Sequence, residues 1–207
     1  DAASSVIKNC AILLQAADLL GIPKLYTEQY PKGLGNTVPE LQPFLDGKKP
    51  IEKTVFSCCA EPKFNRFLSS DRGHVVLAGM ETHICVLQTA LDLQVQGKSV
   101  FVVEDAIISR HPENKANALN RLRQAGVVIT NTESVVFEWL GKAEGEAFNA
   151  ALCIAAKLGT PAASATAAVC LRSSNSSRYS ALDKCPALCC ASNSCACATV
   201  LIVVYSL

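Results

Sequence analysis

The sequence predicts an α/β protein with three layers, in which helices cover both faces of a mainly parallel sheet. Short apolar runs alternate with longer segments of helical periodicity as far as residue 158, and glycine or proline separates most of them. The chain has 207 residues, which is long enough to bury one hydrophobic core.

The first part of the chain predicts two helices separated by extended segments. Apolar residues recur at helical spacing in the first segment, and Gly21 ends it. Glycine and proline then punctuate a long loop between the two extended segments. The expected elements are a helix at 6–20, a strand at 22–27, a loop at 28–49, an extended segment at 51–56 and a helix at 62–70.

From residue 74 onward the alternation becomes regular, as parallel strands with crossover helices require. Proline in the first turn and glycine at the end delimit the helix at 112–125. The expected strands lie at 74–78, 99–103 and 127–130. The expected helices lie at 84–96, 112–125, 132–140 and 144–158.

The charge balance excludes a general electrostatic partner. The chain carries 19 basic and 18 acidic residues, and the basic ones are scattered. We therefore expect no nucleic-acid partner and no membrane partner. No apolar run reaches the roughly 18 residues that a transmembrane helix needs, and the first residues do not resemble a secretory signal.

Cys85 is the candidate nucleophile. It lies in the first turn of the predicted helix that follows the apolar strand at 74–78. The free amide groups and the positive dipole end of a helix favour the thiolate form of a cysteine, and ligands bind at the carboxyl ends of strands in α/β sheets. The alternative is that Cys85 is a small buried hydrophobe, as most such cysteines are.

The sequence around Cys85 favours the interpretation that this residue is a nucleophile. The segment Gly-Met-Glu-Thr-His-Ile-Cys-Val-Leu-Gln-Thr-Ala at 79–90 resembles the cysteine elbow of the isochorismatase-like (cysteine hydrolase) family, which includes isochorismatases and nicotinamidases. Further segments resemble signatures of the family, in its subgroup of eukaryotic isochorismatase-domain-containing proteins. They are 25–35, 52–57, 102–110 and 130–134.

The resemblance implies a Rossmann-like fold and a set of site residues. Cys85 corresponds to the nucleophile of the family and Lys53 to its lysine, which lowers the pKa of the thiol. The Met80-Glu81 bond corresponds to a cis peptide, and the backbone amides of Glu81 and Cys85 to the oxyanion donors. Without the family pattern, Lys53 would be interpreted as a solvated surface lysine.

Three residues near these positions are candidates for binding a substrate: Thr27, Tyr30 and Phe56. Hydroxyl and aromatic residues in such loops are often only structural. Asp105 follows a buried strand, where it either contacts the substrate or caps the next turn.

We expect no cofactor and no metal. Nicotinamidase-like members use an Asp-x-His…His cluster, whereas the three histidines here are His74, His83 and His111. None lies at ligand spacing from another. His83 lies in the elbow, where it faces the substrate, caps the helix or faces solvent.

The chain departs from the family at its start. The first strand of the family ends in a catalytic aspartate and precedes the helix at 6–20, but this stretch is absent and Asp1 is too close to the helix to replace it. We therefore expect residues 1–158 to form a hydrolase domain without its first strand and 159–207 to form an Ala-, Ser- and Cys-rich tail. The tail ends in an apolar, β-branched run at 200–206, which predicts a buried parallel strand in the vacant central position, with Tyr205 near the place of the aspartate. The rival hypothesis places the true first strand upstream and the tail away from the sheet.

Three functions remain open. The first is a cysteine hydrolase that acts on an unidentified small molecule with an amide or similar bond. The alternative is a catalytically inactive member that serves as a binding or interaction module, and the third is a ribonuclease. The resemblance also implies a homo-oligomer and an intracellular location, cytoplasmic or mitochondrial. That location and the odd number of cysteines argue against the disulfide framework of a secreted protein.

Overall fold

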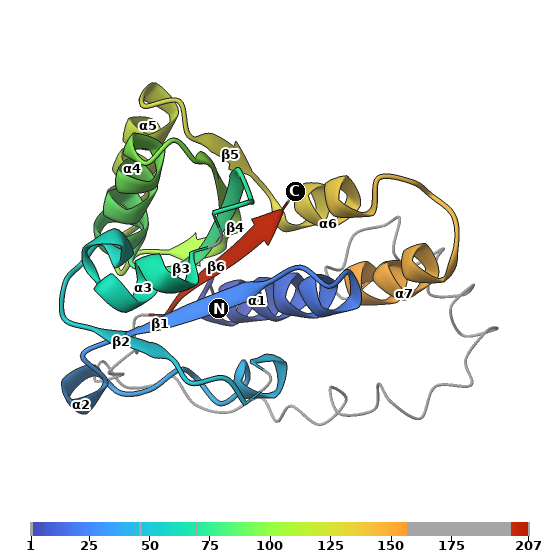
Figure 1. Cartoon of the computed structure of the whole chain (residues 1–207), viewed down its shortest axis with the longest axis horizontal. Helices are drawn as coiled ribbons and strands as arrows, with labels where there is room; N and C mark the ends of the chain where they lie inside the picture. The colour runs from blue at the N-terminus through green and yellow to red at the C-terminus, as the bar shows by residue number, and fades with distance from the viewer. Residues whose placement is uncertain (1, 46, 69, 157–199, 207) are drawn as a thin grey trace.

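A computed structural model describes residues 2–45, 47–68 and 70–156, together with the backbone of 200–206 (Figure 1). Its centre is a six-stranded sheet with the order β2-β1-β6-β3-β4-β5. The strands are β1 (Lys24–Gln29), β2 (Ile51–Lys53), β3 (His74–Met80), β4 (Ser99–Ile108), β5 (Val128–Thr130) and β6 (Val200–Ser206). All neighbours are parallel except β6, so the predicted three-layer, mainly parallel α/β fold is confirmed.

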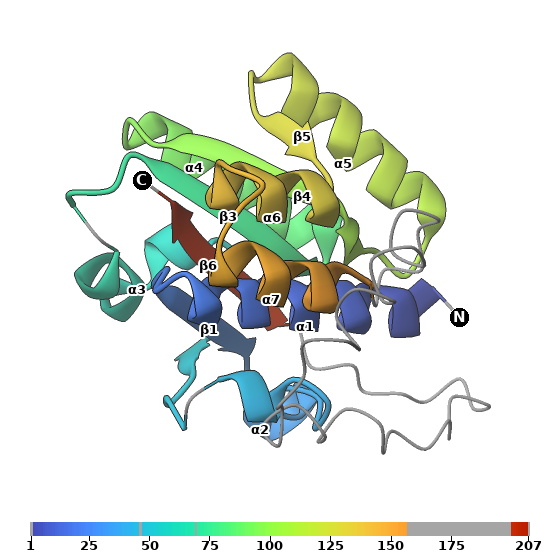
Figure 2. The same cartoon turned by 90° about the vertical axis from the view of Figure 1, so that its right-hand side faces the viewer.

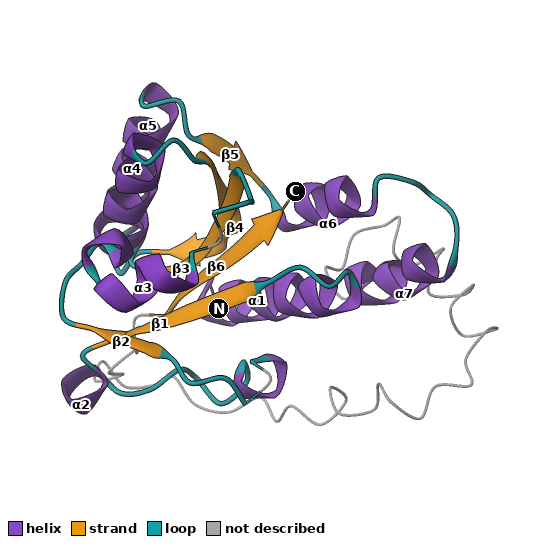
Figure 3. Cartoon of the chain, in the orientation of Figure 1, coloured by secondary structure: helices purple, strands orange, loops and turns teal. Residues whose placement is uncertain are grey.

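Helices cover both faces of the sheet (Figures 2 and 3). One face carries α1 (Ala2–Leu19), α6 (Thr132–Leu140) and α7 (Glu146–Ala155), and the other carries α3 (Pro62–Phe67), α4 (Leu87–Val95) and α5 (Pro112–Gln124). A single short helix, α2 (Pro31–Leu34), follows β1. Most predicted helices and strands are found with small shifts of their ends. The extended segment expected at 51–56 is a strand only over Ile51–Lys53, and β4 runs five residues beyond its expected end at 103.

Strand β3 shows how the sequence pattern builds the two halves of the core. Val75 and Leu77 pack in the cluster that also contains helix α4, whereas Val76 and Ala78 pack in the cluster that contains α1. Successive side chains of a strand point to opposite faces, so a continuous apolar run is what a sheet with two covered faces requires. All four residues are at most 3% exposed.

Strand β6 fills the slot between β1 and β3, as the sequence predicted, but its direction is the reverse of the prediction. It pairs antiparallel with both neighbours. Tyr205 lies opposite Val75 near the start of β3, so the expectation that it stands near the aspartate position is wrong. An antiparallel strand satisfies the backbone groups of both neighbours as well as a parallel one does, and an apolar run carries no information on direction.

Two further observations concern the rest of the chain. Cys153 in α7 is disulfide-bonded, whereas Cys10, Cys58, Cys59 and Cys85 carry free thiols. None of the helices in the described segments is long and apolar enough to cross a membrane. The predicted boundary at 158/159 and the tail as far as residue 199 lie outside the described residues, so the two-part division stays a prediction.

Candidate active site

The predicted elbow connects β3 to helix α4. The Met80-Glu81 peptide bond is cis, as predicted. A wide helical turn, Thr82–Val86, follows it, and the regular helix α4 begins only at Leu87, three residues later than the expected start at 84. Cys85 lies in this turn with 2% of its surface exposed, and the backbone N–H of Glu81 donates a hydrogen bond to its sulfur.

Lys53 lies beside Cys85, as predicted. It ends β2 and is 3% exposed, so it is not the solvated lysine that its isolated sequence context would suggest. Its Nζ lies 3.7 Å from Cys85 Sγ and donates to the carbonyl oxygens of Val55 at 3.0 Å and Phe56 at 2.9 Å. The parallel strands β2 and β3 thus bring an ammonium group and a thiol together at their carboxyl ends.

Gln29, the last residue of β1, also lies at the site, although its sequence context did not mark it as a candidate. Its Nε2 donates to the Thr54 carbonyl oxygen at 2.7 Å, which turns Oε1 toward the site. Oε1 accepts from Lys53 Nζ at 2.5 Å and lies 3.9 Å from Cys85 Sγ. A neutral amide therefore occupies the position beside the thiol where a base would be needed. One feature of the sequence could have indicated Gln29: the strand ends in three consecutive polar residues, 27–29. All three are buried in the structure.

The pKa of Cys85 is raised above its ordinary value, which contradicts the expectation that it is lowered. Removal of the sulfur from water is the main cause, because burial penalises the charged thiolate. The Lys53 ammonium, its hydrogen bond and the Glu81 amide act in the opposite direction but do not outweigh burial. Lys53 Nζ also donates hydrogen bonds to Gln29 and to two backbone carbonyl groups.

A buried carboxylate fixes the loop that follows β1. Glu28 is 1% exposed, and its Oε1 accepts from the backbone N–H of Thr37 at 2.7 Å and from the Thr37 hydroxyl at 2.6 Å. Asn36 Nδ2 donates to its other oxygen at 3.1 Å. Three donors make the buried charge tolerable, and they close the loop over the carboxyl end of β1.

The three residues predicted to bind a substrate lie in different environments. Thr27 is fully buried and its hydroxyl lies 3.6 Å from Cys58 Sγ, so it faces the interior. Tyr30 and Phe56 are each 54% exposed. The backbone N–H of Tyr30 donates to the Lys53 carbonyl oxygen at 2.8 Å, which places Tyr30 directly beside the site. Tyr30 and Phe56 therefore remain candidates for its outer edge.

A second polar cluster lies on the outer side of the elbow. The His83 Nδ1 atom is 3.0 Å from the Ser109 hydroxyl and 3.6 Å from Glu81 Oε2. Arg110 donates to Glu81 from its backbone N–H at 3.1 Å and approaches it with Nε at 3.3 Å. Because serine and glutamate both contact the same ring nitrogen, the group cannot relay a proton through the ring as a hydrolase triad does.

Asp105 has the structural role that the sequence left open. Its Oδ1 accepts from the backbone N–H and the hydroxyl of Thr132, each at 2.8 Å, at the first residue of α6. Next to it, Asn131 caps the same helix by accepting from Ser134 N at 2.9 Å. Within the described residues no three His, Cys, Asp or Glu side chains are grouped as metal ligands.

Comparisons with known proteins identify the family of the chain. The model of the isochorismatase domain matches residues 1–134. The chain belongs to the isochorismatase family. It is similar to isochorismatase domain-containing protein 2 of Danio rerio, with 45% identity over 65% of this chain and 68% of the relative, and to that of Xenopus laevis, with 43% identity over 69% of each chain.

Solved structures of the family have the same fold. The MAR1 ribonuclease of Caenorhabditis elegans is 38% identical, with a TM-score of 0.69 over 73% of this chain and 78% of that one. The YcaC gene product of Escherichia coli, an octameric hydrolase of unknown specificity, is 21% identical, with a TM-score of 0.72 over 80% and 82%. Membership of the isochorismatase family supports a hydrolase-type function for the present chain.

Proposed function

We propose that the chain is a hydrolase that uses Cys85 as its nucleophile on the carbonyl carbon of a small-molecule amide or a related compound. The observation that carries this proposal is the contact between Cys85 Sγ and Lys53 Nζ at 3.7 Å, at the carboxyl ends of two parallel strands. The cis peptide and the Glu81 amide directed at the sulfur support it.

The proposed reaction has two steps. The Cys85 thiolate bonds to the carbonyl carbon, the C–N bond breaks, and the amine leaves with a proton from water; a second water molecule then cleaves the thioester, releasing the acid and restoring the thiol. Lys53 stabilises the thiolate, and the backbone amides of Glu81 and Cys85 would donate to the oxyanion. Gln29 cannot accept the thiol proton permanently, so the proton leaves to solvent, and the rate should rise with pH.

The test is a panel of amides, ureides and vinyl ethers, assayed with the wild-type chain and with Cys85→Ala. We expect turnover that increases toward alkaline pH, because the thiolate fraction grows as the pH approaches the raised pKa of Cys85. Cys85→Ala should abolish it. Turnover that persists in Cys85→Ala would refute the nucleophile, and a rate that falls with rising pH would refute the thiolate step.

The alternative is a non-catalytic binding module. Two observations favour it: Cys85 is only 2% exposed, and the neighbour of its sulfur at the end of β1 is the neutral amide of Gln29. Equilibrium dialysis with the same panel separates the two functions. Saturable binding without turnover at any pH supports the binding module and contradicts the hydrolase.

A ribonuclease is the third proposal, since one similar structure is described as a MAR1 ribonuclease. Cleavage of single-stranded RNA by the purified chain, lost in Cys85→Ala, would support it. Light scattering on the same sample would show whether the chain forms a homo-oligomer, as the family resemblance implies.

A further inference from the structure

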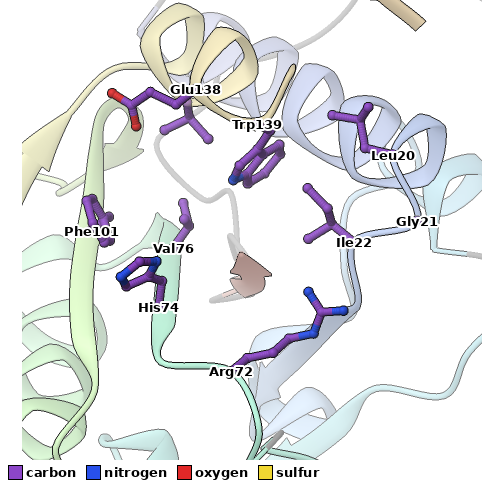
Figure 4. A pocket seen from close by; sticks show the side chains of 10 residues that line it. Leu20, Gly21, Ile22, Arg72, His74, Val76, Phe101, Glu138 and Trp139 are labelled. Carbon is purple, nitrogen blue, oxygen red and sulfur yellow. The ribbon is translucent and has the colours of Figure 1, made fainter. Parts of the chain in front are cut away.

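A cavity lies near the start of β3, at the opposite end of this strand from the elbow that carries Cys85 (Figure 4). Its volume is about 440 Å³, within the range of small-molecule sites in proteins. Strand β3 links the two places, since His74 at its start lines the cavity and Met80 at its end precedes the elbow. Seven residues of strand separate them by about 20 Å. The cavity therefore does not belong to the Cys85 site.

The apolar walls of this cavity come from four parts of the fold. Leu20 and Ile22 follow helix α1, Val76 lies in β3, Phe101 lies in β4, and Trp139 lies in α6. In Figure 4 the indole ring of Trp139 extends into the cavity. A flat apolar molecule would replace water along these walls and would meet the face or edge of an indole ring, which favours aromatic partners.

The cavity also contains a cationic group. Arg72, in the turn before β3, is half-buried and extends its guanidinium group into the cavity from the side opposite Trp139 (Figure 4). No ion pair of Arg72 is found in the part of the chain that the structure describes. Its planar fork of N–H donors matches a carboxylate better than any neutral group.

The other polar residues in the lining do not oppose an anion. Glu138 is exposed, and Figure 4 shows its carboxylate turned away from the centre of the cavity. The ring of His74 packs edge-on against Phe101, with 5.5 Å between centroids, so it forms part of the aromatic wall. The ligand that fits this lining has one negative charge and one aromatic ring.

We propose that this cavity binds a small aryl or arylalkyl carboxylate, with the carboxylate on Arg72 and the ring against Trp139. This proposal is independent of the function of the Cys85 site. Because Trp139 is the only tryptophan of the chain, its fluorescence reports directly on the cavity.

To test this, the full chain is titrated with 3-phenylpropionate and, separately, with its neutral analogue 3-phenylpropanamide. The fluorescence of Trp139 measures binding in both titrations. We expect a saturable change with the acid and binding of the amide that is weaker by about tenfold or more, because the amide cannot pair with the guanidinium group. Arg72→Gln should weaken binding of the acid to the same extent. Arg66→Gln, at an exposed arginine on the neighbouring helix α3, is the matched control and should bind like the wild type.

Two further variants keep the outcome unambiguous. Arg72→Lys retains a cation and should recover part of the affinity, which a merely misfolded Arg72→Gln would not explain. Cys85→Ser should bind the acid like the wild type, because the two sites are separate. No saturable change, equal affinity for acid and amide, or loss of binding in Cys85→Ser would each overturn the proposal.

Discussion

At the residue scale, two opposing effects act on the pKa of Cys85: burial raises it, and the ammonium group of Lys53 lowers it. Substitution of Lys53 removes the second effect and leaves the first. Lys53→Met removes the ammonium group, so the pKa of Cys85 should rise further and alkylation by iodoacetamide at a fixed pH below it should slow by about tenfold for each unit of the rise. The measurement is the pH profile of Cys85 alkylation by mass spectrometry.

Lys63→Met, at an exposed lysine of α3, is the control for that experiment, and Lys53→Arg should restore part of the rate. Cys10 provides an internal reference, since burial raises the pKa of its thiol to about 12 with no cation to offset it. We expect Cys85 to react before Cys10. Equal labelling of both cysteines would show that Lys53 does not activate the thiol.

A second prediction at the residue scale adds a negative charge at Gln29. Gln29→Glu places a carboxylate between Lys53 and Cys85, where it pairs with the ammonium and repels the thiolate. Both effects raise the pKa of Cys85, so its alkylation profile should shift to higher pH by one unit or more, roughly. Gln96→Glu at an exposed position near the end of α4 should leave the profile unchanged. An unshifted profile in Gln29→Glu would contradict the contact seen here.

At the element scale, the loop after β1 depends on one carboxylate. Glu28→Ala leaves the donors of Thr37 and Asn36 without their acceptor, so we expect the free energy of unfolding to fall by about 3 kcal/mol or more. Glu40→Ala, in the same loop but exposed, should change it little. Urea denaturation of both variants compares the two, and similar midpoints would show that the clamp contributes little to stability.

The elements also show how far the sequence could predict this protein. The continuous apolar run placed β3 correctly, because a strand covered on both faces allows few other residues. Lys53 was identified only through resemblance to the family, and Gln29 was missed because a buried polar side chain depends on partners that are distant in sequence. The sign of the pKa shift at Cys85 was wrong because the helix start predicts a charge effect, whereas the depth of burial is set by packing.

At the scale of the whole molecule, β6 joins two parts that would otherwise be separate sheets. On one side lie β1 and β2, on the other β3, β4 and β5, and no pairing joins β1 directly to β3 within the described strands. The two faces of the core extend across this junction, with Leu25 and Tyr26 of β1 packed in the same clusters as Leu77 and Val76 of β3. An empty slot would expose two rows of backbone N–H and C=O groups inside the protein, which is far more costly than losing a surface strand.

This arrangement predicts that the last residues of the chain stabilise the entire domain. Val203 pairs with Leu25 on one side and Leu77 on the other, so Val203→Pro removes a central N–H and should lower the free energy of unfolding by about 3 kcal/mol or more. A chain that ends at residue 199 should lose at least as much, and a synthetic peptide of residues 200–206 added to it should raise its unfolding midpoint in proportion to peptide concentration. If the chain without β6 instead unfolds at the wild-type midpoint with an unchanged urea dependence, the strand contributes nothing to the sheet and the slot must be closed in another way.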